Sequence, residues 1–192
     1  MSNGGMHPHP EALYYHIAVD ALQSAKTEKD EFRRKQCVTT ALVFAALCLE
    51  SFINQEYFSH SETAKVLQEN DRFPIESKWL MLPLLLGSNQ TFDKGKHPYS
   101  IFQELVSTRN NRLVHFKPNK EKVISSEKFG KEYFGELAGN VNLAKKYVKY
   151  VGDMIVELNR LTHGKTNVPL FFEGQKYMSR VWSSATSLNE NI

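Results

Sequence analysis

The residues best suited to chemistry lie together in RNNRLVHFKP, residues 109–118. Two arginines, two asparagines and one histidine occur within seven residues of this stretch. A guanidinium binds two phosphate oxygens at once, and an imidazole exchanges protons near neutral pH. Together they suit cleavage of a phosphodiester, in which a proton moves and charge builds up on the phosphate oxygens. A polar helix end whose cations compensate the helix dipole explains the same composition, and on pattern alone it is the commoner case.

The relative position of Arg109 and His115 restricts how they work together. His115 belongs to the expected last helical turn before Pro118, six residues after Arg109. On a straight α-helix, six residues span about 9 Å and place the two side chains about 120° apart. They meet only if the helix is distorted, if the guanidinium swings around it, or if a second copy of the chain supplies one of them. Asn111 and Arg112 do share the His115 face, so the choice between Arg109 and Arg112 stays open.

Glu50 and Asn54 form a second polar group, within the most apolar helical segment of the chain. Because they are four residues apart, they lie on one face of a helix. A carboxylate beside so many apolar residues requires a cation or several donors, and Arg109 and Arg112 are the candidates. A buried ion pair that fixes helix packing and a role in a site are both open at this point.

Composition describes an ordinary globular chain of 192 residues, 41% hydrophobic and 23% charged, with a net charge of only +3. Any surface for nucleic acid must therefore be local, and residues 109–122 supply one with five basic residues against one acidic. Uninterrupted apolar runs are shorter than the roughly 20 residues that span a bilayer, and the first residues lack a signal-peptide pattern. We therefore expect a cytoplasmic protein without a membrane segment.

Neither a metal nor a cofactor is expected. The chain has no HExxH, CxxC or paired acidic motif. Cys37 and Cys48 are 11 residues apart on one predicted helix. This spacing of about 16 Å is too long for a disulfide, so we expect free, buried thiols.

The elements that must position these residues are helical. Helical spacing of apolar residues predicts helices over 11–27, 30–58, 99–117 and 140–162, with shorter ones in 59–70 and in 75–87, where Gly87 ends the helix. The segment before Glu50 is apolar almost all round and predicts a central buried helix. The expected core stripe of the first helix is Leu13, Ile17, Ala21 and Ala25. That of the last is Ala144, Val148, Val151, Ile155, Leu158 and Leu161.

Strand signals are nearly absent, so we predict an all-α fold, an up-and-down helical bundle of about five helices. Residues 1–10 are expected to form a flexible leader and residues 11–163 the helical domain. Residues 164–192 are expected to form a tail that is partly packed and then disordered.

Residues 109–115 resemble the Rx4–6H signature of the HEPN superfamily, in which asparagine often follows the arginine, as Asn110 does here. The segment ALVFAALCLESFIN is similar to the helix that opens the superfamily's core, and Glu50 matches its acidic residue. The resemblance extends over about residues 31–118, with helix 140–162 closing the bundle. It implies a HEPN-like bundle that dimerises, so that two such motifs face each other across a cleft.

Many HEPN proteins are metal-independent RNases, and the resemblance implies a homodimeric endoribonuclease of this kind. His115 would act as acid or base, and Arg109 would bind the scissile phosphate. Asn110 would orient the phosphate or the histidine, and Glu50 would position Arg109. The remaining basic residues would contact phosphates without regard to sequence: Arg112, Lys117 and Lys120.

The same resemblance implies biological settings and an alternative. An enzyme of this type would act in toxin–antitoxin systems, abortive infection or RNA processing. Its partner would be an RNA substrate and, as an inhibitor, a nucleotidyltransferase-type antitoxin. The alternative is a non-catalytic HEPN-like module that dimerises or binds a nucleotide or a protein through the same cleft.

Overall fold

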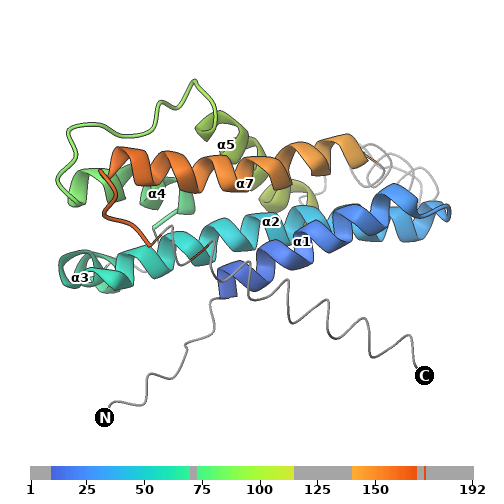
Figure 1. The fold of residues 1–192 in the computed structure, drawn as a ribbon, viewed down its shortest axis with the longest axis horizontal. Coiled ribbons are helices and arrows are strands. Elements are labelled where there is room, and N and C mark those ends of the chain that lie inside the picture. Colours follow the sequence, from blue (N-terminus) through green and yellow to red (C-terminus); the bar gives the residue numbers. More distant parts are fainter. Residues whose placement is uncertain (1–9, 70–72, 115–139, 168–170, 172–192) are drawn as a thin grey trace, which may run out of the picture.

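The computed structural model describes residues 10–69, 73–114, 140–167 and 171. No strand occurs among them, so the predicted all-α helical bundle is confirmed (Figure 1). The elements are α1 (Pro10–Thr27), α2 (Glu31–Ser59), α3 (Ser61–Glu69), α4 (Ile75–Leu85), α5 (Tyr99–Thr108), the π-helical segment η1 (Arg109–Val114) and α7 (Val141–Leu161).

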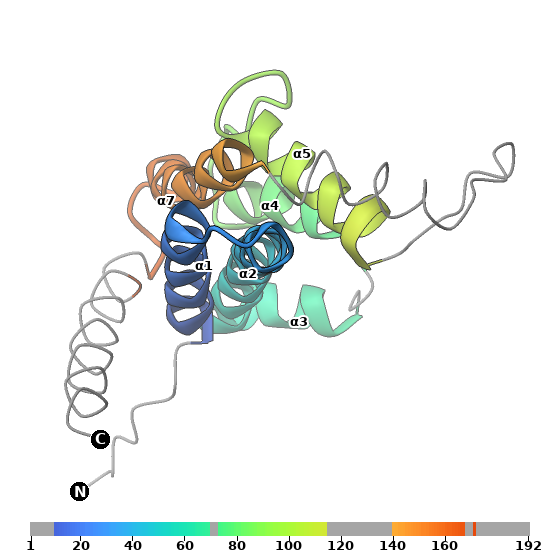
Figure 2. The same cartoon turned by 90° about the vertical axis from the view of Figure 1, so that its right-hand side faces the viewer.

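The two first helices, α1 and α2, run antiparallel and are joined by residues 28–30. Figure 2 shows them side by side, with α4, α5 and α7 over one face of the pair. Asp30 caps α2, because its Oδ1 accepts the N–H of Arg33 at 2.8 Å. Asn140 caps α7 in the same way, accepting the N–H of Leu143 at 2.9 Å. Short polar side chains thus fix where the two longest helices begin.

Helix α2 is the centre of the bundle, as its composition predicts, and it contacts α1, α3, α4, α5, η1 and α7. By length and composition alone α2 would also be able to cross a membrane. The same description fits a core helix, and 50% of its most apolar window is buried inside the protein. Its buried core residues from Ala41 onward are Ala41, Leu42, Ala45, Ala46, Cys48, Leu49, Phe52, Ile53 and Tyr57.

Trp79 of α4 joins several elements through one fully buried ring. It stacks on Phe52 of α2 with ring centroids 6.2 Å apart. It also meets Phe92 of the loop before α5 at 5.8 Å and Phe102 of α5 at 5.7 Å. Phe171 packs edge-on against the other side of this cluster, 5.6 Å from Phe52. Helices α2, α4 and α5 are therefore held in register by one aromatic cluster.

The stripe predicted for α7 is confirmed, since all six of its residues are buried. The stripe predicted for α1 is wrong apart from Ala25, because Leu13, Ile17 and Ala21 are only half-buried. Small side chains let two helices pack closely, so alanines mark this interface better than larger apolar residues do. The hydrophobic residues that α1 does bury are Ala12, Ala18, Leu22 and Ala25.

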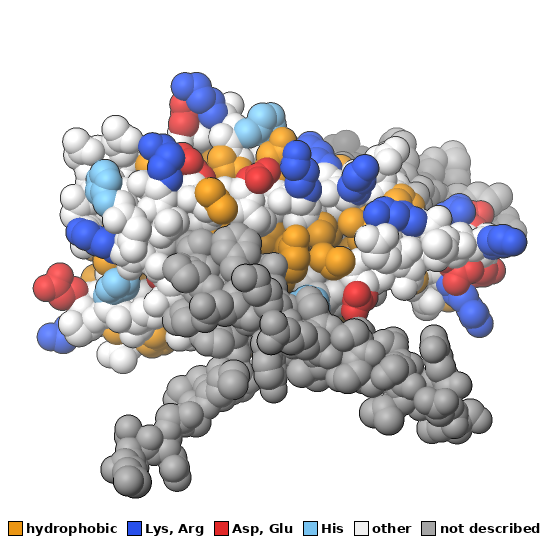
Figure 3. Space-filling model, in the orientation of Figure 1, with side chains coloured by type: hydrophobic (Ala, Val, Ile, Leu, Met, Phe, Trp, Pro, Cys, Tyr) orange, Lys and Arg blue, Asp and Glu red, His pale blue; other side chains and the backbone are white. Residues whose placement is uncertain are grey.

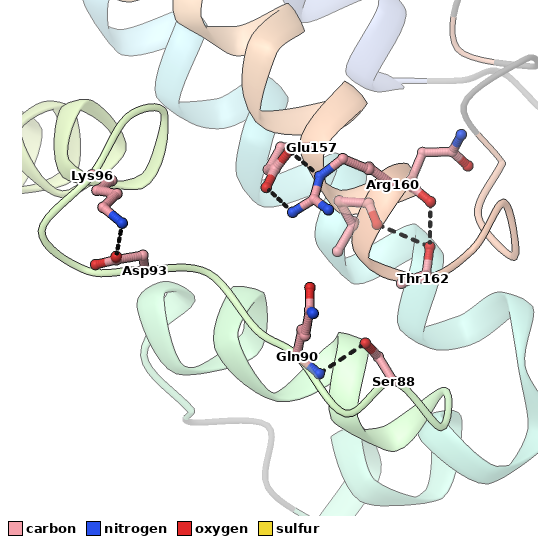
Figure 4. A network of polar contacts seen from close by, with 9 residues as sticks. Ser88, Gln90, Asp93, Lys96, Glu157, Arg160 and Thr162 are labelled. Atoms are coloured by element: carbon pink, nitrogen blue, oxygen red, sulfur yellow. Dashed lines mark hydrogen bonds and ion pairs between the residues drawn. The ribbon is translucent and has the colours of Figure 1, made fainter.

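A glycine ends α4, as predicted. Gly87 has a φ of +84°, and the N–H of Ser88 donates to the carbonyl of Pro83 at 2.9 Å. This is the Schellman pattern, which requires a residue with positive φ. The loop that follows is held by local contacts, including an ion pair of 3.2 Å between Asp93 and Lys96 (Figure 4). The chain thus reaches the start of α5 along a defined path.

Glu56 of α2 is a fully buried carboxyl group. Its Oε1 accepts the N–H of Asn167 at 2.9 Å, while Oε2 has no hydrogen-bond partner in the described part of the chain. Burial raises the pKa of Glu56 from 4.5 to about 7, opposed by the Asn167 hydrogen bonds and reinforced by Glu11. The group is therefore largely neutral below neutral pH.

This raised pKa makes stability depend on pH in a defined direction. The folded protein binds the Glu56 proton more tightly than the unfolded chain, so the contribution is complete below pH 4.5 and is lost as pH rises through about 7. A pKa displaced from 4.5 to about 7 corresponds to about 3 kcal/mol. Glu56→Gln keeps an acceptor oxygen and cannot ionise, so we expect it to be more stable than the wild type at pH 8 and similar at pH 5.

Urea denaturation of both proteins at pH 5 and pH 8 measures this difference. Glu62→Gln, which alters an exposed residue of α3, is the matched control and should follow the wild type at both values. If Glu56→Gln and the wild type have the same free energy of unfolding at pH 8, the raised pKa of Glu56 is contradicted.

Candidate functional site

The helix predicted over residues 99–117 changes form at Arg109. Thr108 ends the α-helical part, and Arg109–Val114 forms a π-helical turn, in which each hydrogen bond spans five residues instead of four. The expectation of one regular α-helix over residues 99–117 is therefore wrong for Arg109–Val114. A local distortion is one of the three conditions under which Arg109 and His115 meet, and π-helical turns occur frequently at functional sites.

Arg109 forms an ion pair with Glu50. Its Nη1 donates to Glu50 Oε2 at 2.7 Å, although the residues are 59 positions apart. The prediction that Glu50 finds a cation is thus confirmed, and Arg109 is that cation. The exposed fractions of the two side chains are 21% for Arg109 and 36% for Glu50, so the pair lies at the edge of the core. At such exposure an ion pair adds only about 1 kcal/mol or less to stability.

The other edge of the Arg109 guanidinium is unpaired. Nε is buried and has no hydrogen-bond partner among the described residues, and Nη2 makes no hydrogen bond there either. A buried donor without a partner costs about 1–3 kcal/mol. The Nε and Nη2 groups form a fork that matches two oxygens of a phosphate. Glu50 therefore holds one side of Arg109, and the Nε–Nη2 side has no partner among the described residues.

The other predicted site residues are placed only in part. Asn110 follows Arg109 in η1, is half-buried and makes no side-chain hydrogen bond within the described ranges. Arg112 also lies in η1, but its side chain falls outside the part that the structure describes. The structure thus brings Glu50 to Arg109, with Asn110 next in the chain. Three predicted residues lie outside the described residues: His115, Lys117 and Lys120.

A cation that was not among the predicted site residues, Lys78 of α4, also reaches the face of α2 that carries Glu50. Only 7% of Lys78 is exposed, and its Nζ donates to Asn54 Oδ1 at 2.8 Å. Asn54 lies one helical turn after Glu50, so the α2 face that receives Arg109 also receives Lys78. A signal was present: Lys78 is the only basic residue of the apolar segment 75–87.

A hollow of about 460 Å³ lies near the end of α2, lined in part by Ser59, Glu62, Leu86 and Lys165. Ser59 is nine residues after Glu50, about 13 Å further along the helix. The Nζ of Lys165 already donates to the carbonyl of Leu86 at 2.6 Å. Glu62 adds a negative charge to the same wall. The hollow is therefore poorly suited to phosphate.

The surface around α7 is also poorly suited to binding phosphate. Figure 3 shows basic, acidic and apolar side chains interspersed over it. On α7 itself, exposed Lys145 and Lys149 are followed by exposed Asp153 and Arg160. Charges of both signs keep a uniform basic patch from forming among the side chains described on this face. The α2 face with Glu50 and Asn54 remains the best candidate.

Both cysteines are free, as expected. Cys48 is buried, but Cys37 is only half-buried, so the expectation of two buried thiols is wrong for Cys37. Burial, with a smaller effect of Glu11, raises the pKa of the Cys48 thiol well above its usual value, which makes it a poor nucleophile. Within the described ranges, no three His, Cys, Asp or Glu residues gather as a possible metal site.

Comparisons of the chain with protein-family models, curated proteins and solved structures gave no match. The resemblance to HEPN proteins therefore depends on the sequence features described above. What the chain does has to be argued from the Glu50–Arg109 pair and its surroundings.

Proposed function

We propose that the chain is a metal-independent endoribonuclease of the HEPN type that acts as a homodimer. The observation that carries the proposal is the Glu50–Arg109 ion pair, which fixes the guanidinium and leaves its Nε–Nη2 edge without a partner among the described residues. Asn110 adjoins this edge in the chain, and His115 follows six residues after Arg109. These are the residue types that phosphodiester cleavage requires.

In the proposed reaction, Arg109 binds the two non-bridging oxygens of the scissile phosphate and stabilises the charge that develops there. His115 takes the proton of the ribose 2′-OH as its oxygen attacks phosphorus. The bond from phosphorus to the 5′-oxygen breaks, and that oxygen takes a proton from the imidazolium. The products are a 2′,3′-cyclic phosphate and a 5′-hydroxyl. Asn110 orients the phosphate or the imidazole.

The proposal includes a setting. A cytoplasmic RNase of this kind acts in RNA processing, or as the toxin of a toxin–antitoxin or abortive-infection system. As a toxin it would damage its own cell unless it were inhibited. A nucleotidyltransferase-type antitoxin is the partner that the HEPN resemblance implies.

The Arg109→Met variant tests the role of the ion pair. We expect RNA cleavage in EDTA to fall by about 10² to 10³, because removing one donor to a developing oxyanion has an effect of this size. Arg109→Lys keeps the charge but loses the fork, so it should recover only part of the rate. The measurement is the rate of cleavage of a labelled RNA on a denaturing gel, with the products tested for a 2′,3′-cyclic phosphate.

Arg160→Met is the matched control, because Arg160 also pairs with a glutamate, Glu157, at 2.7 Å, but on the exposed surface of α7. It should cleave as the wild type does. Equal rates for Arg109→Met and the wild type would refute the phosphate-binding role. A folded wild-type dimer that binds RNA or nucleotide but never cleaves it would instead establish the non-catalytic module.

A further inference from the structure

Lys78 is a buried lysine that forms no ion pair with any residue that the structure describes. Its ammonium has three donors, and its one hydrogen bond in the described part of the chain goes to the neutral amide oxygen of Asn54. The half-buried lysines Lys35 and Lys146 do form ion pairs. Lys35 pairs with Glu31 at 2.7 Å, and Lys146 pairs with Glu104 at 2.6 Å. Removing an ion from water costs several kcal/mol unless it is paired. Packing alone therefore gives little reason for a cation at position 78.

The position of this cation connects it to the proposed site. Lys78 comes from α4 and Arg109 from η1, and both bind polar residues on one stripe of α2. Their acceptors, Asn54 and Glu50, are four residues apart, which is about one helical turn of 5.4 Å. Figure 2 shows α1 on one side of α2 and the η1 end of the α5 helix on the other.

The charges on this stripe do not cancel. Arg109 and Lys78 contribute two positive charges and Glu50 one negative charge, which leaves one positive charge without an acidic partner. Glu50 compensates Arg109, whereas none of the acidic side chains that the structure describes pairs with Lys78. The Glu50 side chain is 36% exposed, so solvent reaches the Glu50 end of the stripe, whereas Lys78 lies deeper, with 7% exposed.

We propose that Lys78, oriented by Asn54, is a second phosphate-binding residue of this site. It binds the phosphate next to the one held by Arg109, so the site takes two successive phosphates of single-stranded RNA. Lysine suits this position because a point charge accepts a phosphate in many orientations, whereas the scissile phosphate is held by the directional fork of arginine. This inference rests on the proposed function, and it assigns to Lys78 a contribution to RNA affinity.

Lys78→Met tests the assignment, because methionine keeps an unbranched apolar side chain and removes the ammonium with its charge and its hydrogen bond to Asn54. The probe is a fluorescent 2′-O-methyl oligouridylate, which lacks the attacking hydroxyl and therefore reports binding without cleavage. We expect Lys78→Met to bind it about tenfold more weakly at low salt, as for loss of one charged hydrogen bond. The slope of log affinity against log salt should fall by about 0.7, the value for one phosphate contact on a single strand.

Lys26→Met is the matched control, because Lys26 also donates to a neutral amide oxygen, Gln23 Oε1, but at an exposed position on α1. It should leave affinity and slope unchanged. Thermal denaturation shows whether each variant is folded, and Lys78→Gln replaces Lys78→Met if the latter does not fold.

The outcomes separate this inference from the proposed function. A Lys78 variant with the affinity and salt slope of the wild type overturns the inference, and wild-type cleavage by that variant leaves the proposed function intact. A wild-type protein that neither binds the probe nor cleaves RNA overturns both. Weaker binding with an unchanged salt slope also overturns the inference, because it indicates an indirect effect on packing.

Discussion

His115→Ala is expected to cleave RNA about 10² to 10⁴ times more slowly than the wild type, the usual contribution of a general acid or base. The reason is chemical. The 2′-oxygen is a poor nucleophile until a base removes its proton, and the 5′-oxygen is a poor leaving group until it receives one. Histidine serves both needs near neutral pH. Alanine serves neither, while Arg109, held by Glu50, would still bind the phosphate in the proposed mechanism.

Single-turnover cleavage of a labelled RNA in EDTA measures this loss. His163→Asn is the matched control: it removes an exposed histidine at the end of α7, where φ is +55° and asparagine is tolerated. Added imidazole should restore part of the rate to His115→Ala, which a purely structural histidine would not allow. If His115→Ala cleaves as fast as the wild type, another group moves the proton and the proposed mechanism is wrong.

Trp79→Ala is expected to lower the free energy of unfolding by about 3–5 kcal/mol, the range for large aromatic residues in a core. Trp79 is fully buried, and its ring contacts Phe52, Phe92 and Phe102. Alanine would leave a cavity where α2, α4 and α5 meet. Since α4 also carries Lys78, loss of this packing would disturb the face that we propose binds phosphate.

Circular dichroism during urea denaturation is the suitable measurement, because the substitution removes one of only two tryptophans and would change a fluorescence signal. Trp79→Phe is the matched variant, and its free energy of unfolding should fall much less than that of Trp79→Ala. It keeps an aromatic ring and deletes an indole N–H that has no hydrogen-bond partner in the described part of the protein. A loss below about 1 kcal/mol for Trp79→Ala would show that the aromatic cluster does not hold the helices together.

Local patterns predicted much of the fold. The stripe of α7 and the central role of α2 follow from periodicity and composition, and Gly87 ends α4 because its positive φ suits a residue without a side chain. The interface of α1 was misjudged because it is built from alanines, which apolar ranking places below leucine and isoleucine. The π-helical turn at Arg109 was also missed, since residues 109–114 carry no local signal that separates it from an α-helix.

Pairings across the chain were the hardest part to predict. The need of Glu50 for a cation was evident from its apolar neighbours, but two arginines qualified and the sequence did not choose between them. The hydrogen bonds from Lys78 to Asn54 and from Asn167 to Glu56 join residues that only the packing of helices brings together. An isolated polar residue in an apolar segment, such as Lys78, is the one sequence signal that indicates such a partner.

The π-helical turn also constrains how the length of this chain can change. Its hydrogen bonds span one residue more than those of an α-helix, so η1 corresponds to an α-helical turn that has absorbed a single insertion. Deleting one residue between Arg109 and Val114 would restore α-helical spacing without rotating the segments on either side, because the turn already absorbs the extra residue. Alignments of related chains should therefore place a gap of one residue within this turn, where the flanking side chains keep their direction.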